Sequence, residues 1–478
     1  MEPGRPLRAL LLLLLAVLPL TAARFGCPSQ HKIEPCTCKT KKEGLDIVCE
    51  SADTAQLRRA MNHIKEVPNS EIQYMKIRDC VLPRLTDYFF MSLIIKKLFI
   101  IRSQLATIED NALTSLAEPL VTIDLSSNKI KTIPSGAFRR LHNVHTLNLH
   151  SNKIEAIPRQ AFTGLSNMSR LSLYDNNIAK VDDDAFYGLP SLLSLNLMQN
   201  HLTAVPSKAI HSLTALERLE LQINHITDIK TNDFTGLSKL DSLLLENNRI
   251  KALPARAFTE LSQLTKLNIE HNQVAYIDKL AFQGLEQTLE WLSLGDNKIF
   301  GIPTQALRGL HRLKQLDLKH NNISIIPEDA FEGFGQSLKF LCLQKNHIKT
   351  IPPGTFMQMH SLEWLKLSNN EITTIPLETV ESLLDSLEVI DLYQNPLVCN
   401  CELVWFKEWI DRHSDDEEFQ TLHHEPHCRK FDSKHIVSVK KLPASEFNCP
   451  TSGQPSAAEA AAWPALLAAA CAAARRPQ

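Results

Sequence analysis

The stretch Leu243–Ile250 reads LLLENNRI and follows the pattern L-x-L-x-x-N-x-I, which Leu147–Ile154 repeats as LNLHSNKI. A period of 24 or 25 residues separates successive copies of its asparagine, which stands at Asn128, Asn152, Asn176, Asn200, Asn224, Asn248, Asn272, Asn297, Asn321, Asn346, Asn370 and Asn395. Cys80 and Ser103 take the same place in two weaker copies, which brings the total to about 14 repeats. Self-similarity of this length predicts a solenoid of stacked units.

Each residue type in the pattern has a structural role. The L-x-L segment predicts a short strand whose leucines point inward, and strands of successive repeats stack in parallel. The asparagine amide both donates and accepts, so it can satisfy backbone groups where the chain leaves the strand. Ten residues later comes a large apolar side chain, which predicts a stacked spine of Phe138, Phe162, Phe186, Ile210, Phe234, Phe258, Phe282, Leu307, Phe331, Phe356 and Val380. We therefore predict an α/β solenoid with a parallel sheet on its concave side.

The beginning of the chain and its cysteines indicate an oxidising compartment. Arg5 and Arg8 precede the apolar run Ala9–Leu20 and then small residues, which is typical of a secretory signal peptide cleaved after Ala23. The run is shorter than the roughly 20 residues of a spanning helix. Most of the 11 cysteines form two groups of four, at Cys27, Cys36, Cys38 and Cys49 and at Cys399, Cys401, Cys428 and Cys449. This distribution predicts a disulfide-bonded module at each end of the repeats, with connectivity left open by spacing alone.

The two cysteine groups resemble the flanking caps of extracellular leucine-rich-repeat proteins. Residues Asn395–Phe406 read NPLVCNCELVWF, with Trp409 one helical turn on, and Cys36 and Cys38 form an early C-x-C pair. Chondroadherin, the Slit ectodomains and the acid-labile subunit of the insulin-like growth factor complex are similar assemblies. The resemblance implies a curved horseshoe and bonds from first to third and second to fourth cysteine: Cys27–Cys38, Cys36–Cys49, Cys399–Cys428 and Cys401–Cys449.

The expected organisation is a signal peptide at 1–23, an N-terminal cap at 24–62, repeats at 63–396, a C-terminal cap at 397–449 and an alanine-rich tail at 450–478. Trp405, Phe406 and Trp409 share one helix face and are expected to cover the last repeat rather than anchor a ligand. Cys80 should point into the core and stay reduced. The tail is interpreted first as disordered, with a lipid-anchor signal or a short spanning helix as alternatives.

Composition and motifs argue against catalysis and against nucleic acid. The formal net charge is only -2, whereas a nucleic-acid-binding surface needs a large basic excess. No P-loop, nucleophile elbow or H-E-x-x-H is present, so we expect no enzyme and no cofactor. A histidine-rich run holds the zinc-type side chains His423, His424, Glu425, His427 and Cys428, and an acidic run covers 415–418. We interpret both as solvated loops and predict no metal site.

Surface modification and small basic clusters can also be read from the sequence. Asn167 and Asn322 begin N-x-S sequons and are predicted glycosylation sites. Two small lysine clusters, which could contact sulfated glycans, are interpreted as ordinary surface: Lys39, Lys41 and Lys42, and Lys440 and Lys441.

Strand alternation predicts which side chains face the concave surface. In the middle and late repeats they are Arg218, Glu220, Glu246, Lys266, Glu270, Trp291, Phe340, Trp364, Lys366, Asp391 and Tyr393. Their charges nearly cancel, which disfavours a polyanion such as heparin. Clustered aromatic residues are typical of protein-binding hot spots. We predict a patch centred on Trp291, Trp364 and Tyr393; the alternative is that these rings only pack on one another.

The resemblance implies a secreted or cell-surface scaffold that acts in adhesion, matrix organisation or ligand capture, with extracellular proteins as partners. A soluble carrier or regulatory subunit, and the ectodomain of a membrane-anchored receptor, are the alternatives. Membrane attachment through the tail stays open.

Overall fold

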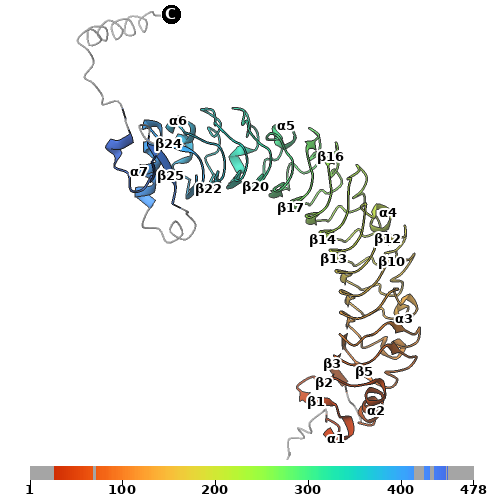
Figure 1. Ribbon diagram of the computed structural model, residues 1–478. Coiled ribbons are helices and arrows are strands. Elements are labelled where there is room, and N and C mark those ends of the chain that lie inside the picture. The colour runs from red at the N-terminus through yellow and green to blue at the C-terminus, as the bar shows by residue number, and fades with distance from the viewer. Residues whose placement is uncertain (1–25, 68–70, 414–424, 431–434, 448, 450–478) are drawn as a thin grey trace, which may run out of the picture. The chain divides into compact units, whose positions relative to one another are not determined.

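The computed structural model describes residues 26–67, 71–413, 425–430, 435–447 and 449. The chain forms two compact units, each of which is a solenoid (Figure 1): unit 1 is Met1–Lys153 with Thr163–Met168, and unit 2 is Ile154–Phe162 with Ser169–Gln478. The predicted signal peptide, the tail, the acidic run at 415–418, His423 and His424 lie outside the described residues. Within the described part of the chain, no helix combines the length and the apolar character needed to cross a membrane.

Unit 1 begins with a disulfide-bonded hairpin. Helix α1 (Gln30–Ile33) leads into strands β1 (Cys36–Lys41) and β2 (Gly44–Glu50), which pair antiparallel. The structure has the bonds Cys27–Cys38 and Cys36–Cys49, the pairs that the resemblance implies. Because β2 also pairs in parallel with the first repeat strand, the hairpin covers the edge that the ladder would otherwise leave open.

Helix α2 (Thr54–Ile64) follows the hairpin and is fixed by a capping box. The Gln56 amide donates to Asp53 Oδ1 at 2.8 Å, and the Asp53 amide donates to Gln56 Oε1 at 2.9 Å. Two of the backbone donors at the helix start are thereby satisfied. Leu57 and Met61 lie one turn apart and are buried, so this helix closes the core of the first repeats.

The remaining elements of unit 1 form a parallel ladder with short segments opposite it. The ladder comprises β3 (Glu71–Arg78), β5 (Ile94–Ile95), β6 (Lys97–Ile101), β8 (Thr122–Asp124) and β9 (Thr146–Asn148). The segments opposite are β4 (Arg84–Leu85), β7 (Thr107–Ile108), η1 (Thr114–Leu116) and α3 (Ser135–Phe138).

Unit 2 continues the same design as an in-register parallel sheet. Its strands are β11 (Arg170–Ser172), β13 (Ser194–Asn196), β14 (Arg218–Glu220), β15 (Ser242–Leu244), β17 (Lys266–Asn268), β19 (Trp291–Ser293), β20 (Gln315–Asp317), β21 (Phe340–Cys342), β22 (Trp364–Lys366) and β23 (Val389–Asp391). The central residue of each strand pairs with its counterpart in the next, as Leu219 does with Leu243. One row of buried side chains therefore runs beneath the sheet.

Short elements opposite the sheet complete the repeats of unit 2. They are β10 (Ala156–Ile157), β12 (Lys180–Val181), α4 (Ser207–Ile210), β16 (Ala252–Leu253), β18 (Tyr276–Ile277), α5 (Thr304–Leu307), η2 (Gly335–Ser337), α6 (Leu377–Val380) and η3 (Glu381–Leu383). Strand β10 pairs with β12, and β16 with β18.

The pattern asparagines form a buried hydrogen-bond ladder, as predicted. Asn248 Oδ1 accepts from the Ile226 amide at 3.0 Å, and its Nδ2 donates to the carbonyls of Leu221 and Leu245, each at 3.0 Å. The asparagine thus joins its own repeat to the preceding one. In unit 1, Ser103 and Cys80 replace the asparagine, and both are buried. Cys80 is a free thiol, as expected from its place in the ladder.

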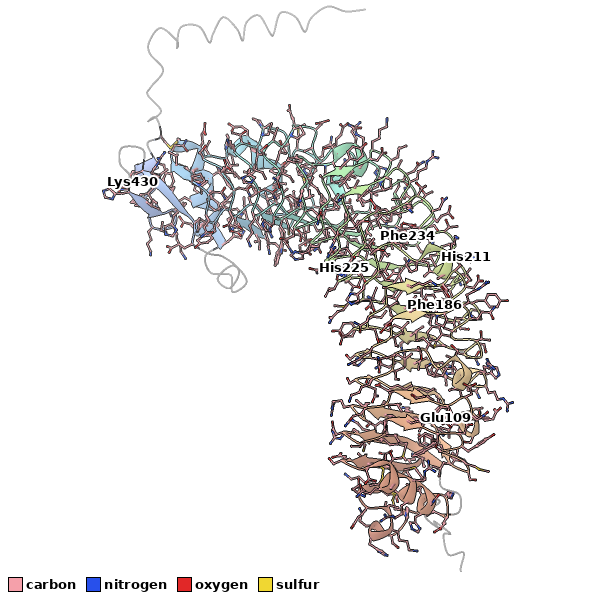
Figure 2. The ribbon with its side chains drawn as sticks, turned by 45° about the vertical axis from the view of Figure 1, so that its right-hand side comes forward. Glu109, Phe186, His211, His225, Phe234 and Lys430 are labelled. Carbon is pink, nitrogen blue, oxygen red and sulfur yellow. A yellow bond between two sulfur atoms is a disulfide. The ribbon has the colours of Figure 1, made fainter. Side chains whose placement is uncertain are left out.

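The apolar spine is likewise buried and stacked. In unit 2 the rings of Phe162 and Phe186 lie 5.9 Å apart between centroids, and those of Phe258 and Phe282 lie 6.1 Å apart. Figure 2 labels Phe186 and Phe234 within the body of the repeats. These phenylalanines are core residues, and no cofactor contact is needed to account for them.

A second disulfide-bonded module closes unit 2. It contains β24 (Leu397–Cys399), η4 (Cys401–Leu403), α7 (Val404–His413), β25 (His427–Lys430), β26 (Ile436–Ser438) and η5 (Ala444–Phe447). The structure has the bonds Cys399–Cys428 and Cys401–Cys449, again the pairs that the resemblance implies.

The aromatic face of α7 packs on the last repeat. Trp405, Phe406 and Trp409 are buried, and Trp405 Nε1 donates to the Ile375 carbonyl at 2.8 Å. The prediction that these rings cover the last repeat is confirmed, and the alternative of a ligand anchor is wrong because little of them reaches the surface.

Candidate ligand-binding face

The outward side of the unit 2 strands, here called the sheet face, carries three rows of side chains. The first strand residues form row 1, the third strand residues form row 2, and the residues two places beyond form row 3. Row 1 contains Arg218, Lys266, Trp291, Phe340 and Trp364; row 2 contains Glu220, Lys366 and Asp391; row 3 contains Glu246, Glu270 and Tyr393. Except for Arg218, which is exposed, all of these side chains are partly buried by their neighbours.

Phe340 and Trp364 form the main aromatic cluster of the sheet face. They lie directly opposite each other on β21 and β22, with ring centroids 5.6 Å apart and planes tilted by 60°. Lys366 Nζ lies 5.1 Å from the centre of the Trp364 ring, within cation–π range. The sheet face therefore presents the two aromatic rings of Phe340 and Trp364 with the ammonium group of Lys366 beside them.

Trp291 stands apart from this cluster. Gln315 occupies the intervening place in row 1, between Trp291 on β19 and Phe340 on β21. Lys266 Nζ lies 4.4 Å from the centre of the Trp291 ring. The predicted patch is thus divided into two aromatic groups, each with its own lysine.

Tyr393 is also offset from Trp364. The row 1 neighbour of Trp364 on β23 is Val389, which is buried, whereas Tyr393 lies four residues further along in row 3. The structure therefore brings together Phe340, Trp364 and Lys366 and places Tyr393 at the far edge of the same repeats. The alternative that rings pack on one another describes Phe340 and Trp364, whereas Trp291 has Gln315 as its next neighbour in row 1.

Two glutamates of the sheet face have raised pKa values. Burial raises the pKa of Glu220 and of Glu246 above the ordinary glutamate value, and the positive charge of Arg218 only partly offsets this for Glu220. Glu220 also accepts a hydrogen bond from Asn196 Nδ2 at 2.6 Å. Glu246 Oε2 has no hydrogen-bond partner among the described residues.

Sequence reasoning missed a charged network in the next repeats. Burial raises the pKa of Asp317, which accepts from the Lys319 amide at 2.9 Å. Lys319 Nζ contacts Glu270 and lies 3.4 Å from Asp317 Oδ2. Asp317 and Lys319 occupy rows 2 and 3, so the alternation that identified Glu270 would also have found them.

Cys342 is an unreactive thiol rather than a nucleophile. It lies in row 2, on the strand that follows Asp317. Burial, with a smaller contribution from the negative charge of Asp317, raises the pKa of Cys342 to about 11. A thiol with such a pKa is almost entirely protonated at neutral pH and is a poor nucleophile.

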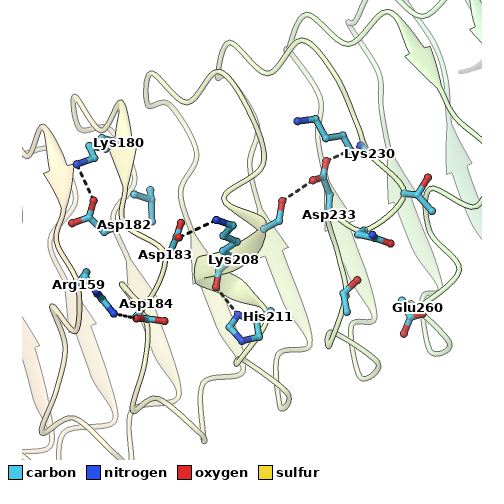
Figure 3. Close-up of a pocket in the computed structure, with 15 residues that line it drawn as sticks. Arg159, Lys180, Asp182, Asp183, Asp184, Lys208, His211, Lys230, Asp233 and Glu260 are labelled. Carbon is cyan, nitrogen blue, oxygen red and sulfur yellow. Dashed lines mark hydrogen bonds and ion pairs between the residues drawn. The ribbon is translucent and has the colours of Figure 1, made fainter.

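On the opposite side of unit 2 lies a broad, open hollow of about 1420 Å³ (Figure 3). Its aspartates are each bound to a donor: Asp182 to Lys180, Asp183 to Lys208, Asp184 to Arg159 and Asp233 to Ser207. The hydrogen bond from Lys180 is the main cause that lowers the pKa of Asp182. Internal pairing of this kind leaves little charge to recognise a ligand.

The metal-binding candidates differ from those considered in the sequence. The Cys428 sulfur is bonded to Cys399, so it cannot serve as a thiolate ligand. Among the described residues, Glu270, His271 and Asp296 instead bring potential ligand atoms within 4.8 Å of one another. Local motif spacing could not reveal this group, because His271 and Asp296 come from different repeats.

The sequon residues Asn167 and Asn322 are exposed, whereas the residues that follow them, Met168 and Ile323, are buried. Their glycosylation therefore remains a proposal compatible with the surface position of both side chains.

Comparison with known proteins identifies the repeats. Residues 95–154, 142–202, 194–250, 238–288, 287–341 and 336–397, together more than half of the chain, match the leucine rich repeat family. Leucine-rich repeat-containing protein 3 of Danio rerio is 39% identical over 141 residues, which are 27% of this chain and 45% of that relative. The chain thus spans less than half of that relative's length.

Two solved structures show the same fold. A chain of the TLR13–ssRNA13 complex is 23% identical with a TM-score of 0.58, over 83% of this chain and 63% of that chain. A chain of the LRIM1/APL1C complex is 20% identical with a TM-score of 0.56, over 76% of this chain and 64% of that chain. The repeat pattern, the asparagine ladder, the parallel sheet and the family match agree, and the chain belongs to the leucine-rich repeat family.

Proposed function

We propose that this chain is an extracellular binding protein that takes a protein ligand on the sheet face of unit 2. The observation that carries the proposal is the Phe340–Trp364 pair with Lys366 beside it. Tryptophan and other large aromatic side chains are enriched at binding hot spots, where they bury much apolar area at little entropic cost. Trp291 with Lys266 offers a second anchor two strands away.

Unsatisfied acceptors in row 3 support the same face. Gln222 Oε1, Glu246 Oε2 and Gln344 Oε1 are buried, and none has a hydrogen-bond partner among the described residues. An unpaired buried polar atom costs about 1–3 kcal/mol, so native proteins rarely leave several in one row. A ligand that turns these side chains outward on binding, and presents backbone N–H groups, lysine or arginine, would satisfy them. Such donors belong to a protein rather than to a polyanionic glycan.

The disulfides support the proposed location. Four such bonds are typical of proteins in oxidising compartments, which fits a secreted or cell-surface protein. In this proposal the modules at 24–62 and 397–449 shield the ends of the solenoid. The protein acts in adhesion, matrix organisation or ligand capture, and no catalytic step is part of that role.

The proposal is tested by secreting the tagged full chain and identifying what it captures. The double variant Trp364→Ser, Tyr393→Ser should lose the captured ligand while its melting temperature is unchanged. Tyr187→Ser serves as the control, because Tyr187 is 58% exposed and lies outside the three rows. Lost stability with retained capture would show that the rings only pack on each other.

The same experiment separates the alternative roles. One stoichiometric soluble partner indicates a carrier or regulatory subunit of an extracellular complex. Retention of the chain at the cell surface indicates the ectodomain of a membrane-anchored receptor. Recovery with insoluble matrix components indicates adhesion or matrix organisation.

A further inference from the structure

One edge of the unit 2 sheet carries imidazole and carboxylate side chains at equivalent places in consecutive repeats. His271, Asp296 and His320 each directly precede a ladder asparagine. Their φ values are 53°, 52° and 51°, so the three backbones have the same left-handed conformation. Because adjacent repeats have the same backbone geometry here, their side chains point in the same direction. Neighbouring side chains are then separated by about the ~4.8 Å that separates the strands. Residues 24 or 25 positions apart in sequence are thereby neighbours.

We propose that Glu270, His271 and Asp296 bind a divalent transition-metal ion, with Zn²⁺ as the ion that the donor set fits. His271 Nε2 lies 3.6 Å from Glu270 Oε1 and 3.7 Å from Asp296 Oδ2. Zinc bonds of about 2.0–2.2 Å in a tetrahedron place ligand atoms roughly 3.3–3.6 Å apart. These two separations are close to that edge length and too long for hydrogen bonds, and the two carboxylate oxygens lie within 4.8 Å of each other.

The His271 ring is available for such a bond. It makes no hydrogen bond within the described part of the chain, although two carboxylates stand beside it. Its side chain is 49% exposed and borders a hollow of about 620 Å³, which gives an ion a path from solvent. A mixed set of one imidazole and two carboxylates suits zinc better than Mg²⁺ or Ca²⁺, which prefer oxygen ligands alone.

His320 acts as a positioning residue. Its Nδ1 is hydrogen-bonded to Asp296 Oδ1, which leaves Oδ2 of the same carboxylate directed to His271. Carboxylates that ligate zinc are commonly held in this way by an outer partner. The three protein ligands leave one tetrahedral position for water or for a ligand group.

Lys319 is the main competitor for the site. Its ammonium contacts Glu270 Oε1 and lies 3.4 Å from Asp317 Oδ2. Metal binding at Glu270 requires Lys319 to turn to Asp317, which is already within reach. Lys345 also lines the hollow and adds positive charge to its rim. Removing the Lys319 charge should therefore strengthen metal binding, an effect that a purely structural ion pair would not produce.

The test uses the full chain, stripped with a chelator and titrated with ZnCl₂ by isothermal calorimetry. The intact chain should bind one more zinc ion than Asp296→Asn or His271→Gln, whereas CaCl₂ and MgCl₂ should give no comparable heat. His320→Gln should keep the stoichiometry and weaken the affinity about 10–100-fold. Lys319→Gln should bind zinc more tightly than the intact chain.

Two controls isolate the site. His347→Gln removes an exposed histidine of the same hollow that contacts Glu371, and zinc binding should be unchanged. A His423→Gln, His424→Gln chain removes two of the histidines in the histidine-rich run and should keep the extra ion. Melting curves in chelator identify any variant that fails to fold. If Asp296→Asn fails to fold, the zinc stoichiometry of His271→Gln tests the proposal, because His271 is half exposed. Wild-type stoichiometry and affinity in both Asp296→Asn and His271→Gln would overturn the proposal.

Discussion

Gln222 and Glu246 occupy the same place in neighbouring repeats, and each holds one buried side-chain oxygen with no hydrogen-bond partner in the described part of the chain. Burial raises the pKa of Glu246, although the backbone N–H of the same residue partly opposes this. Folded chains therefore bind the Glu246 proton more tightly than unfolded chains. The linkage relation then requires stability to fall as pH rises from the unfolded pKa of about 4.3 through the raised folded pKa.

Glu246→Gln should consequently stabilise the protein at pH 7.5 and leave the free energy of unfolding nearly unchanged at pH 4. Urea unfolding at the two pH values measures the difference. Glu388→Gln is the matched control, because Glu388 is exposed. An equal gain at both pH values, or a loss at pH 7.5, would contradict the role assigned to burial.

Asn248→Ala should destabilise the protein by about 1–3 kcal/mol, since it leaves the Ile226 amide and the Leu221 and Leu245 carbonyls short of a partner. Hydrogen exchange should show the damage first in the neighbouring repeats, because each repeat contacts only its neighbours. Asn232→Ala, at an exposed position, should change stability by less than about 0.5 kcal/mol. An unfolding curve for Asn248→Ala that matches the intact chain would refute the ladder.

Ile223→Asn should stabilise the chain by about 1 kcal/mol. Ile223 has φ of 51°, a conformation that β-branched residues avoid and asparagine tolerates, and its side chain is 40% exposed. Chemical unfolding gives the change. Leu193→Asn, which is similarly exposed but has no positive φ, should bring no such gain. An equal gain at Leu193 would show that removing an exposed apolar side chain, not relief of the backbone conformation, is the cause.

Cys342 and Cys80 should resist alkylation in the folded protein at pH 8. Burial is the main cause that raises the pKa of both thiols, to about 11 for Cys342, so little of either thiol is ionised at pH 8. Iodoacetamide labelling followed by mass spectrometry should modify them only after unfolding. Labelling of Cys342 in the folded protein as fast as an exposed thiol would mean that this row 2 position is accessible to solvent.

The solenoid could be predicted from the sequence because every repeat has the same pattern of inward leucines and a buried asparagine. The asparagine of Asn248 and the large apolar residue of Phe258 recur every 24 or 25 residues, and a repeated inward leucine leaves one consistent register. Strand alternation also identified Trp364 and Lys366 as sheet-face residues, since side-chain direction follows directly from the pleat.

The composition of the candidate site was harder to predict, because it depends on which neighbours meet across strands. Gln315 separates Trp291 from Phe340, although all three residues stand at the same place in their strands. The group of His271 and Asp296 was missed because its members are close only through the left-handed backbone conformation that each repeat adopts before its asparagine. Such contacts become visible once the repeats are placed in register.

Footprinting of the captured complex by hydroxyl radicals tests the sheet-face account most directly. Ligand binding should protect Phe340 and Trp364 from oxidation, and Trp291 to a smaller degree. Tyr187 and Met357, which are 58% and 63% exposed and lie outside the three rows, should be oxidised equally in the free and bound chain. Protection of Tyr187 or Met357 with unchanged oxidation of Phe340 and Trp364 would contradict the account and place the ligand elsewhere on the repeats.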